Sequence, residues 1–245
     1  MTIVVVHLYP RELGINGDVG NVTALRKRAQ WRGLPLQVHD HEVGAELPAS
    51  AHLVHIGSGP VSGQEAVRDD LARITSTLRA WSDAGVPFLA IAGGWQLLGA
   101  ELVGLDVVAT AGPGIFPSRA TLMVDRHVGE VAATSALGEI AGFENHGAVT
   151  ELIGDAQPFA QITRRTGRGP GAEGVIVGHR VGTNLHGPLL PMNPVWADWF
   201  LDAAAELAGL TATAPAPAPA PAPALAIVDE RAAKSRDAVR GRLGG

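Results

Sequence analysis

The segment Pro87–Gly99, with the sequence PFLAIAGGWQLLG, has the pattern of a nucleophile elbow. An apolar run typical of a buried strand leads into a glycine turn and then into a helix. Such a turn holds a nucleophile in a strained conformation, and the next backbone N–H can stabilise an oxyanion. Ala92 occupies the nucleophile position and Gly93 follows it. The segment therefore predicts a reaction centre for acyl transfer that lacks its reacting atom.

Acyl transfer from an amide also needs a base and a second N–H donor. The turn Gly57-Ser58-Gly59 follows a short apolar run and could supply the donor, although such a turn alone is usually structural. His186 stands at a predicted strand end, where a base could be exposed, although a lone histidine is more often structural. Because Pro188 stands two residues after His186, any orienting carboxylate must come from another segment or be absent.

The chain contains no cysteine, which excludes disulfides, thiolate metal sites and a cysteine nucleophile. No serine or threonine stands at or beside position 92, and Ser58 is poorly placed to attack from a loop on the oxyanion side. Removing the nucleophile of a serine protease lowers turnover about a million-fold. We therefore expect no efficient hydrolysis by the chain as written. We also predict no metal site.

The elements that must position these residues alternate between strand and helix patterns. This alternation predicts an α/β fold with a mainly parallel sheet flanked by helices. The predicted strands cover 2–8, 36–41, 53–56 and 86–92, with the first strand central, and the predicted helices cover 21–31, 64–84, 94–102 and 193–207. Asp18 or Asn21 is the expected N-cap of the first helix. Short β runs between 106 and about 185, broken by glycine and proline, predict an antiparallel extension.

The composition bounds the class of protein. The chain has 245 residues, 46% hydrophobic and 18% charged, which indicates a globular protein with a sizeable core. A net charge of −5 without a basic stripe argues against a nucleic-acid partner. Neither a signal peptide nor an apolar run long enough to cross a bilayer is evident, so we expect a cytoplasmic chain without stable membrane insertion.

The C-terminal region is predicted to be separate from the main domain, residues 1–210. Residues 214–224 alternate alanine and proline, which favours an extended polyproline conformation for a linker over residues 211–224. Residues 225–245 are basic and have a helix-forming composition. They could be a disordered, solubilising tail or a helix that docks on a partner.

Four motifs stand in the order that one enzyme family has them. They are His7–Pro10 with Asn16–Asn21, Ile91–Gly99, Gly142–Gly147 and Leu185–Pro191. Together they resemble the GatD subunits of lipid II isoglutaminyl synthases, within the cobyric-acid-synthase-like class I glutamine amidotransferases. The resemblance covers residues 1 to about 208. It implies a flavodoxin-like class I glutamine amidotransferase fold.

The resemblance also implies a function and a partner. Subunits of this family hydrolyse L-glutamine and pass ammonia to a MurT-like Mur ligase subunit in a heterodimer. That partner, with ATP and magnesium, amidates D-glutamate of the peptidoglycan precursor lipid II. The chain itself is expected to carry no cofactor.

Residue by residue, the resemblance implies the following roles. Ala92 occupies the place of the nucleophilic cysteine, and His186 that of the catalytic histidine. The turn Glu144–Gly147 matches a family signature and is expected to shape the site. The oxyanion donors expected from the local pattern are Gly93 and Gly59, and the expected substrate-binding residues are Arg126, Gly57 and Gln96.

The chain also departs from the family pattern. Trp95 replaces a tyrosine, the segment 112–117 lacks an acidic residue, and Ala148 stands where the family tends to have a glycine followed by an arginine. These departures, together with Ala92, indicate a divergent branch. They weaken the assignment of Arg126 more than that of His186.

Several interpretations of Ala92 stay open. The alanine could be natural, in a pseudo-glutaminase that serves as a regulatory or scaffold partner of a Mur-ligase-like protein using free ammonia. It could instead be an engineered replacement in an active glutaminase. A third interpretation is a flavodoxin-like binding protein without catalytic role. A corrinoid-amidating subunit is less favoured, because the chain has no phosphate-binding loop motif.

Overall fold

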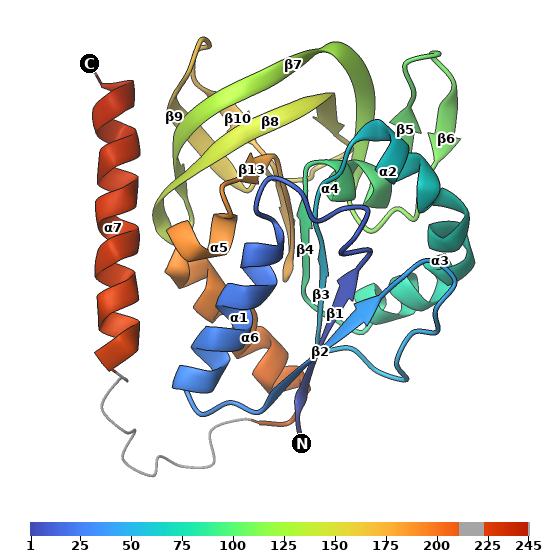
Figure 1. Cartoon of the computed structure of the whole chain (residues 1–245). Coiled ribbons are helices and arrows are strands. Elements are labelled where there is room, and N and C mark those ends of the chain that lie inside the picture. The colour runs from blue at the N-terminus through green and yellow to red at the C-terminus, as the bar shows by residue number, and fades with distance from the viewer. Residues whose placement is uncertain (211–222, 245) are drawn as a thin grey trace.

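The computed structural model describes residues 1–210 and 223–244, so most of the predicted linker, residues 211–222, lies outside the described residues (Figure 1). The first sheet has six strands in the order β11-β12-β4-β3-β1-β2, and all but β11 are parallel. Its strands are β1 (Ile3–Leu8), β2 (Leu36–His41), β3 (Leu53–Ile56), β4 (Phe88–Ile91), β11 (Val175–Val177) and β12 (Arg180–Thr183). The predicted central position of the first strand is wrong, because β3 and β4 occupy the middle.

Helices cover both faces of this sheet (Figure 1). Side chains at alternate positions along a strand point to opposite faces. Leu89 packs in one hydrophobic cluster with α1 (Val19–Trp31) and α6 (Pro194–Leu207), whereas Phe88 packs in another with α3 (Arg68–Asp83). This sheet is thus buried on both sides, as its nearly continuous apolar strands require.

The remaining helices of the main domain are short. They are α2 (Val61–Ala66), α4 (Gly93–Leu98) and α5 (Leu189–Met192). The helix predicted over 64–84 is therefore two helices, which meet at Val67. The helix predicted over 94–102 is wrong beyond Leu98, because Gly99 is extended and β5 begins at Glu101.

A second, mixed sheet lies above the first in the view of Figure 1. It contains β5 (Glu101–Val103), β6 (Ala109–Ala111), β7 (Ser118–Ser135), β8 (Gly138–Leu152), β9 (Ala160–Arg165), β10 (Gly171–Glu173) and β13 (Leu185–His186). The antiparallel extension predicted for this region is correct only in part. Strands β7 and β8 are long rather than short, and β11 and β12 join the first sheet, where β12 runs parallel to β4.

The chain crosses from one sheet to the other between β12 and β13. Strand β12 ends in the first sheet, and β13 pairs with β8 in the second, with His186 opposite Phe143. This crossing places His186 at the junction of the two sheets.

The basic C-terminal region forms helix α7 (Pro223–Leu243), which packs against α1, α5 and strands of the second sheet (Figure 1). The structure thus has a helix docked on its own chain, which neither sequence interpretation included. Only Ala232 and Val239 of α7 are buried. In the described parts of the chain, no helix combines the length and the apolar character that crossing a bilayer demands.

Candidate active site

The predicted site residues gather where parallel strands of the first sheet end. The loops that follow β1, β3, β4 and β12 meet at this edge, which is where open α/β sheets bind their ligands. The loops after β1, β3 and β4 contain Asp18, Ser58 and Ala92, and His186 lies in β13, which follows β12.

Ala92 forms a tight elbow between β4 and α4. Its φ and ψ angles are 41° and −103°, a conformation that side-chain-bearing residues rarely adopt. Its N–H donates to the carbonyl of Thr183 at 2.7 Å, and its carbonyl accepts from Gln96 N–H at 2.9 Å. A Cβ at Gly94 would lie 2.5 Å from the carbonyl oxygen of Gly57, so only glycine lets α4 begin so close to the neighbouring loop.

His186 is fully buried and is oriented by Asp18. The histidine Nδ1 lies 3.1 and 3.2 Å from the two carboxylate oxygens, and Asp18 is also fully buried. Among the described residues, no hydrogen-bond partner meets His186 Nε2. A base held by a carboxylate at one nitrogen and free at the other is the arrangement that general-base catalysis uses.

Asp18 is the functional residue that sequence reasoning missed. The sequence predicted it only as a possible helix N-cap, but its side chain caps no helix N–H. Its carboxylate instead accepts from Ser58 N–H at 2.9 Å and faces His186. The available signal was its place in the motif Asn16–Asn21, where it is the only carboxylate.

Ser58 connects the elbow to the pair formed by Asp18 and His186. Gly93 N–H donates to Ser58 Oγ at 3.3 Å, and the Ser58 backbone N–H donates to Asp18. Contacts therefore run without a break from the elbow to His186. The N–H expected to stabilise an oxyanion is bonded to a hydroxyl that a ligand oxygen would have to replace.

Gly57 and Gly59 are needed for close packing. A Cβ at Gly57 would lie 2.2 Å from the carbonyl oxygen of Leu13, and one at Gly59 would lie 2.2 Å from that of Glu12. The loop after β3 therefore fits tightly against the loop after β1, which carries Asp18.

A cavity of about 230 Å³ opens at the elbow. Five predicted site residues line it: Gly59, Ala92, Gly93, Gln96 and Arg126. The other lining residues are Ser58, Val61, Gln64, Leu105, Leu122, Met123, Val124, Asn145, His146 and Gly147. His186 and Gly57 do not line it. The cavity is below the ~300–1,000 Å³ typical of sites for drug-sized ligands, so its size suits a small metabolite.

Arg126 presents an oriented guanidinium at this cavity. It lies where the pairing of β7 with β8 is interrupted, between Leu122 and His127. Its Nε and Nη2 donate to Asn145 Oδ1 at 3.2 and 2.9 Å, and Asn145 Nδ2 donates to Asn16 Oδ1 at 3.1 Å. A guanidinium fixed in this way can bind a carboxylate through paired hydrogen bonds.

The signature turn beside Arg126 contains a buried carboxylate. Glu144 is buried, which acts to raise its pKa, but the ring of His146, whose Nε2 lies 3.7 Å from Glu144 Oε1, and the charges of Arg165 and Arg168 outweigh burial and lower it. Asn145, His146 and Gly147 of this turn line the cavity.

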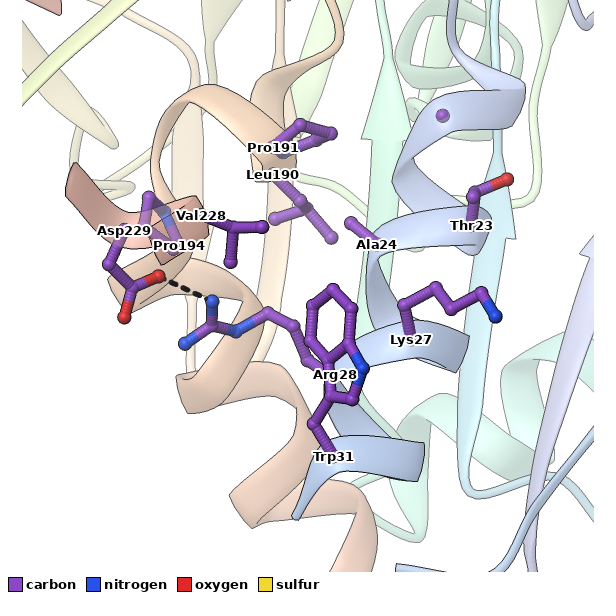
Figure 2. Close-up of a pocket in the computed structure, with 11 residues that line it drawn as sticks. Thr23, Ala24, Lys27, Arg28, Trp31, Leu190, Pro191, Pro194, Val228 and Asp229 are labelled. Carbon is purple, nitrogen blue, oxygen red and sulfur yellow. Dashed lines mark hydrogen bonds and ion pairs between the residues drawn. The ribbon is translucent and has the colours of Figure 1, made fainter. Parts of the chain in front are cut away.

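Another cavity, of about 290 Å³, lies between α1, α5 and α7 (Figure 2). Its walls are mostly apolar, and an ion pair between Arg28 and Asp229 closes one side. None of the predicted site residues lines it. No cluster of three or more histidine, aspartate or glutamate side chains suited to a metal ion occurs within residues 1–210 and 223–244.

Comparison with known proteins gives this geometry a context. Residues 4–194 match the CobB/CobQ-like glutamine amidotransferase domain. Subunit GatD of the glutamine-hydrolysing lipid II isoglutaminyl synthase of Staphylococcus aureus is 30% identical over 85% of this chain and 86% of its own length. A cobyric acid synthase of Cereibacter sphaeroides is 32% identical, over 59% of this chain and 31% of its own length.

A crystal structure of a glutamine amidotransferase superposes with a TM-score of 0.56 and 16% identity, over 82% of this chain and 98% of that one. At this identity the likeness concerns the fold alone. It confirms the class I glutamine amidotransferase fold expected from the sequence.

Proposed function

The chain belongs to the CobB/CobQ-like glutamine amidotransferase family, and on that basis we propose that it is the glutamine-binding subunit of a lipid II isoglutaminyl synthase. Its role there is to serve the amidation of D-glutamate in the peptidoglycan precursor. The similarity to the GatD subunit of Staphylococcus aureus along most of both chains supports this assignment. The cobyric acid synthases give weaker support to a corrinoid substrate, because they match a smaller part of the chain.

The observation that carries the proposal is the shared cavity of the elbow and Arg126. A glutamine whose α-carboxylate binds Arg126 can extend its side-chain amide toward Ala92 within this one cavity. Asp18 and His186 form an oriented carboxylate–imidazole pair that is connected to the elbow through Ser58. These groups supply the substrate site and the base, and only the nucleophile is missing.

The second subunit is proposed to be a MurT-like Mur ligase that holds ATP and magnesium. Ammonia released or admitted at the glutamine site would reach the activated D-glutamate there. The localisation in the cytoplasm follows from this partnership and stays part of the proposal.

Ala92 favours a second candidate, a pseudo-glutaminase. A chain without a nucleophile can bind glutamine and hold its partner in position while the synthetase uses free ammonia. The two candidates share the site and differ in the source of nitrogen.

One experiment tests both candidates. The Mur-ligase-like partner is combined with the unaltered chain or with Ala92→Cys, and amidation of lipid II is measured with glutamine or with ammonium chloride. We expect the unaltered complex to use only ammonium, and Ala92→Cys to gain glutamine-dependent amidation. Arg119→Ala, an exposed arginine outside the cavity, serves as a control for Arg126→Ala.

The outcomes separate the candidates. Ammonium-dependent amidation without any gain from Ala92→Cys would support the pseudo-glutaminase. If Arg126→Ala and Arg119→Ala bind glutamine equally well in calorimetry, the proposed substrate site is wrong.

A further inference from the structure

The carboxamide of Gln64 lies directly against the elbow. Gln64 belongs to α2, its side chain is 8% exposed, and it lines the cavity that holds Ala92 and Arg126. A Cβ at Gly93 would lie 2.8 Å from Gln64 Nε2 and 3.1 Å from its Cδ. A side chain at position 93 would therefore displace this carboxamide.

The two ends of this carboxamide differ in their contacts. Nε2 donates to the carbonyl oxygen of Gly59 at 3.4 Å. Oε1 is buried and, within the described part of the chain, accepts no hydrogen bond. Leaving a buried acceptor without a partner is unfavourable, and a ligand that donates a hydrogen bond can complete it. His186 Nε2 has the same status.

The partner that Gln64 Oε1 lacks must be a hydrogen-bond donor. Under the proposed function, on which this inference rests, the group that reaches the elbow is the side-chain amide of glutamine. That amide has two N–H donors, whereas the side-chain carboxylate of glutamate has none and is negatively charged. An oxygen acceptor in the wall of this cavity binds the first and repels the second.

We infer that Gln64 selects the side-chain amide of glutamine over the carboxylate of glutamate, by accepting a hydrogen bond from the amide at Oε1. Arg126 binds the α-carboxylate that both amino acids share, so it cannot make this distinction. Sites that pair a buried polar group with a substrate N–H reject analogues that lack it far better than apolar pockets do. Glutamate is the product of the family's reaction, so this residue would also promote its release.

The test uses the unaltered full chain, which cannot consume its ligand because residue 92 is alanine. Calorimetry measures three ligands: L-glutamine, L-glutamate and 4-carbamoylbutanoate, which is glutamine without its α-amino group. We expect Gln64→Met to weaken binding of glutamine and of 4-carbamoylbutanoate by about tenfold or more, the fold-change for roughly 1.4 kcal/mol. Glutamate affinity should stay the same or rise. Gln161→Met, the same change at an exposed position of β9, should alter none of the three.

Gln64→Glu is the second variant. It keeps an acceptor beside the elbow and adds a negative charge, so it should keep measurable glutamine binding and weaken glutamate binding below that of the unaltered chain. Thermal unfolding of both variants checks that each is folded, and either variant alone is sufficient for the ligand comparison.

Three results would overturn the inference. Equal loss of glutamine and glutamate binding in Gln64→Met, with 4-carbamoylbutanoate unaffected, would place Gln64 at the α-amino group. Unchanged affinities would remove it from the site. No binding of glutamine by the unaltered chain would reject the proposed function and this inference together, whereas the first two results reject only the inference.

Discussion

The carboxylate of Asp18 orients a histidine that follows it by 168 residues in the chain. Replacing it with asparagine keeps the shape of the side chain but favours the wrong imidazole tautomer, as in serine proteases, where the change lowers turnover about ten-thousand-fold. In an Ala92→Cys chain with its partner, we expect Asp18→Asn to lower glutamine-dependent turnover by roughly a thousand-fold or more. Ammonia release measures this effect.

Asp155→Asn, at an exposed position, is the matched control for this change. Glutamine affinity should change little in Asp18→Asn, because Asp18 does not line the cavity. Equal turnover in the two variants would show that Asp18 has no role in orienting His186.

At the scale of single residues, the sequence predicted those site residues that lie within one local motif. The elbow at Ala92 is visible because strand, glycines and helix follow one another within a single segment. The role of Asp18 was not predictable in the same way, because it depends on contacts between loops far apart in the chain.

At the scale of the elements, strand β3 in the middle of the first sheet contains a titratable residue, His55. His55 is fully buried, with its Nδ1 3.1 Å from the carbonyl oxygen of Leu89. Burial, together with the nearby ring of His7, lowers the pKa of His55 to about 3. Below a pH of about 6.5 the unfolded chain binds a proton at this residue and the folded chain does not. Stability must therefore fall as the pH falls from about 6.5 toward 3.

We expect His55→Gln to reduce this pH dependence. The free energy of unfolding of the unaltered chain should fall more steeply between pH 6 and pH 4, by up to about 1.4 kcal/mol per pH unit. Urea unfolding at several pH values measures both slopes, and His39→Gln on the edge strand β2 of the same sheet is the control. Parallel slopes for His55→Gln and the unaltered chain would contradict the prediction.

The elements of the first sheet were predictable because their apolar runs are short, buried and bounded by turn residues. The strands of the second sheet were less predictable, because β7 and β8 have many half-exposed residues and their pairing is interrupted after Leu122. Pairing with β4 decides that β12 belongs to the first sheet, and such long-range pairing leaves no local pattern.

At the scale of the whole molecule, α7 covers a domain that is complete without it. Neither hydrophobic cluster contains a residue of α7. Ion pairs hold much of the helix instead, including Asp229 with Arg28, Arg240 with Glu139 and Arg242 with Glu130. Partly exposed pairs of this kind contribute little each, typically about 0–1 kcal/mol.

A chain ending at Leu210 is therefore expected to stay folded and to lose about 1–3 kcal/mol of unfolding free energy. Circular dichroism and urea unfolding measure both properties. Asp229→Ala in the full chain should speed hydrogen exchange at the start of α7 without affecting β3. Loss of cooperative unfolding in the shortened chain would mean that α7 is part of the core.

The backbone angles of Ala92 have a consequence for heat resistance. An alanine at positive φ is less stable there than a glycine by about 1 kcal/mol, even after the greater freedom of glycine in the unfolded chain is counted. Ala92→Gly should thus raise the melting temperature by about 2–4 °C, as judged by calorimetric scanning. The strained backbone at position 92 thus lowers the melting temperature, and it would be useful only with a side chain that carries a reactive atom. A lower melting temperature for the glycine variant would show that the alanine methyl group contributes more through packing than its backbone conformation costs.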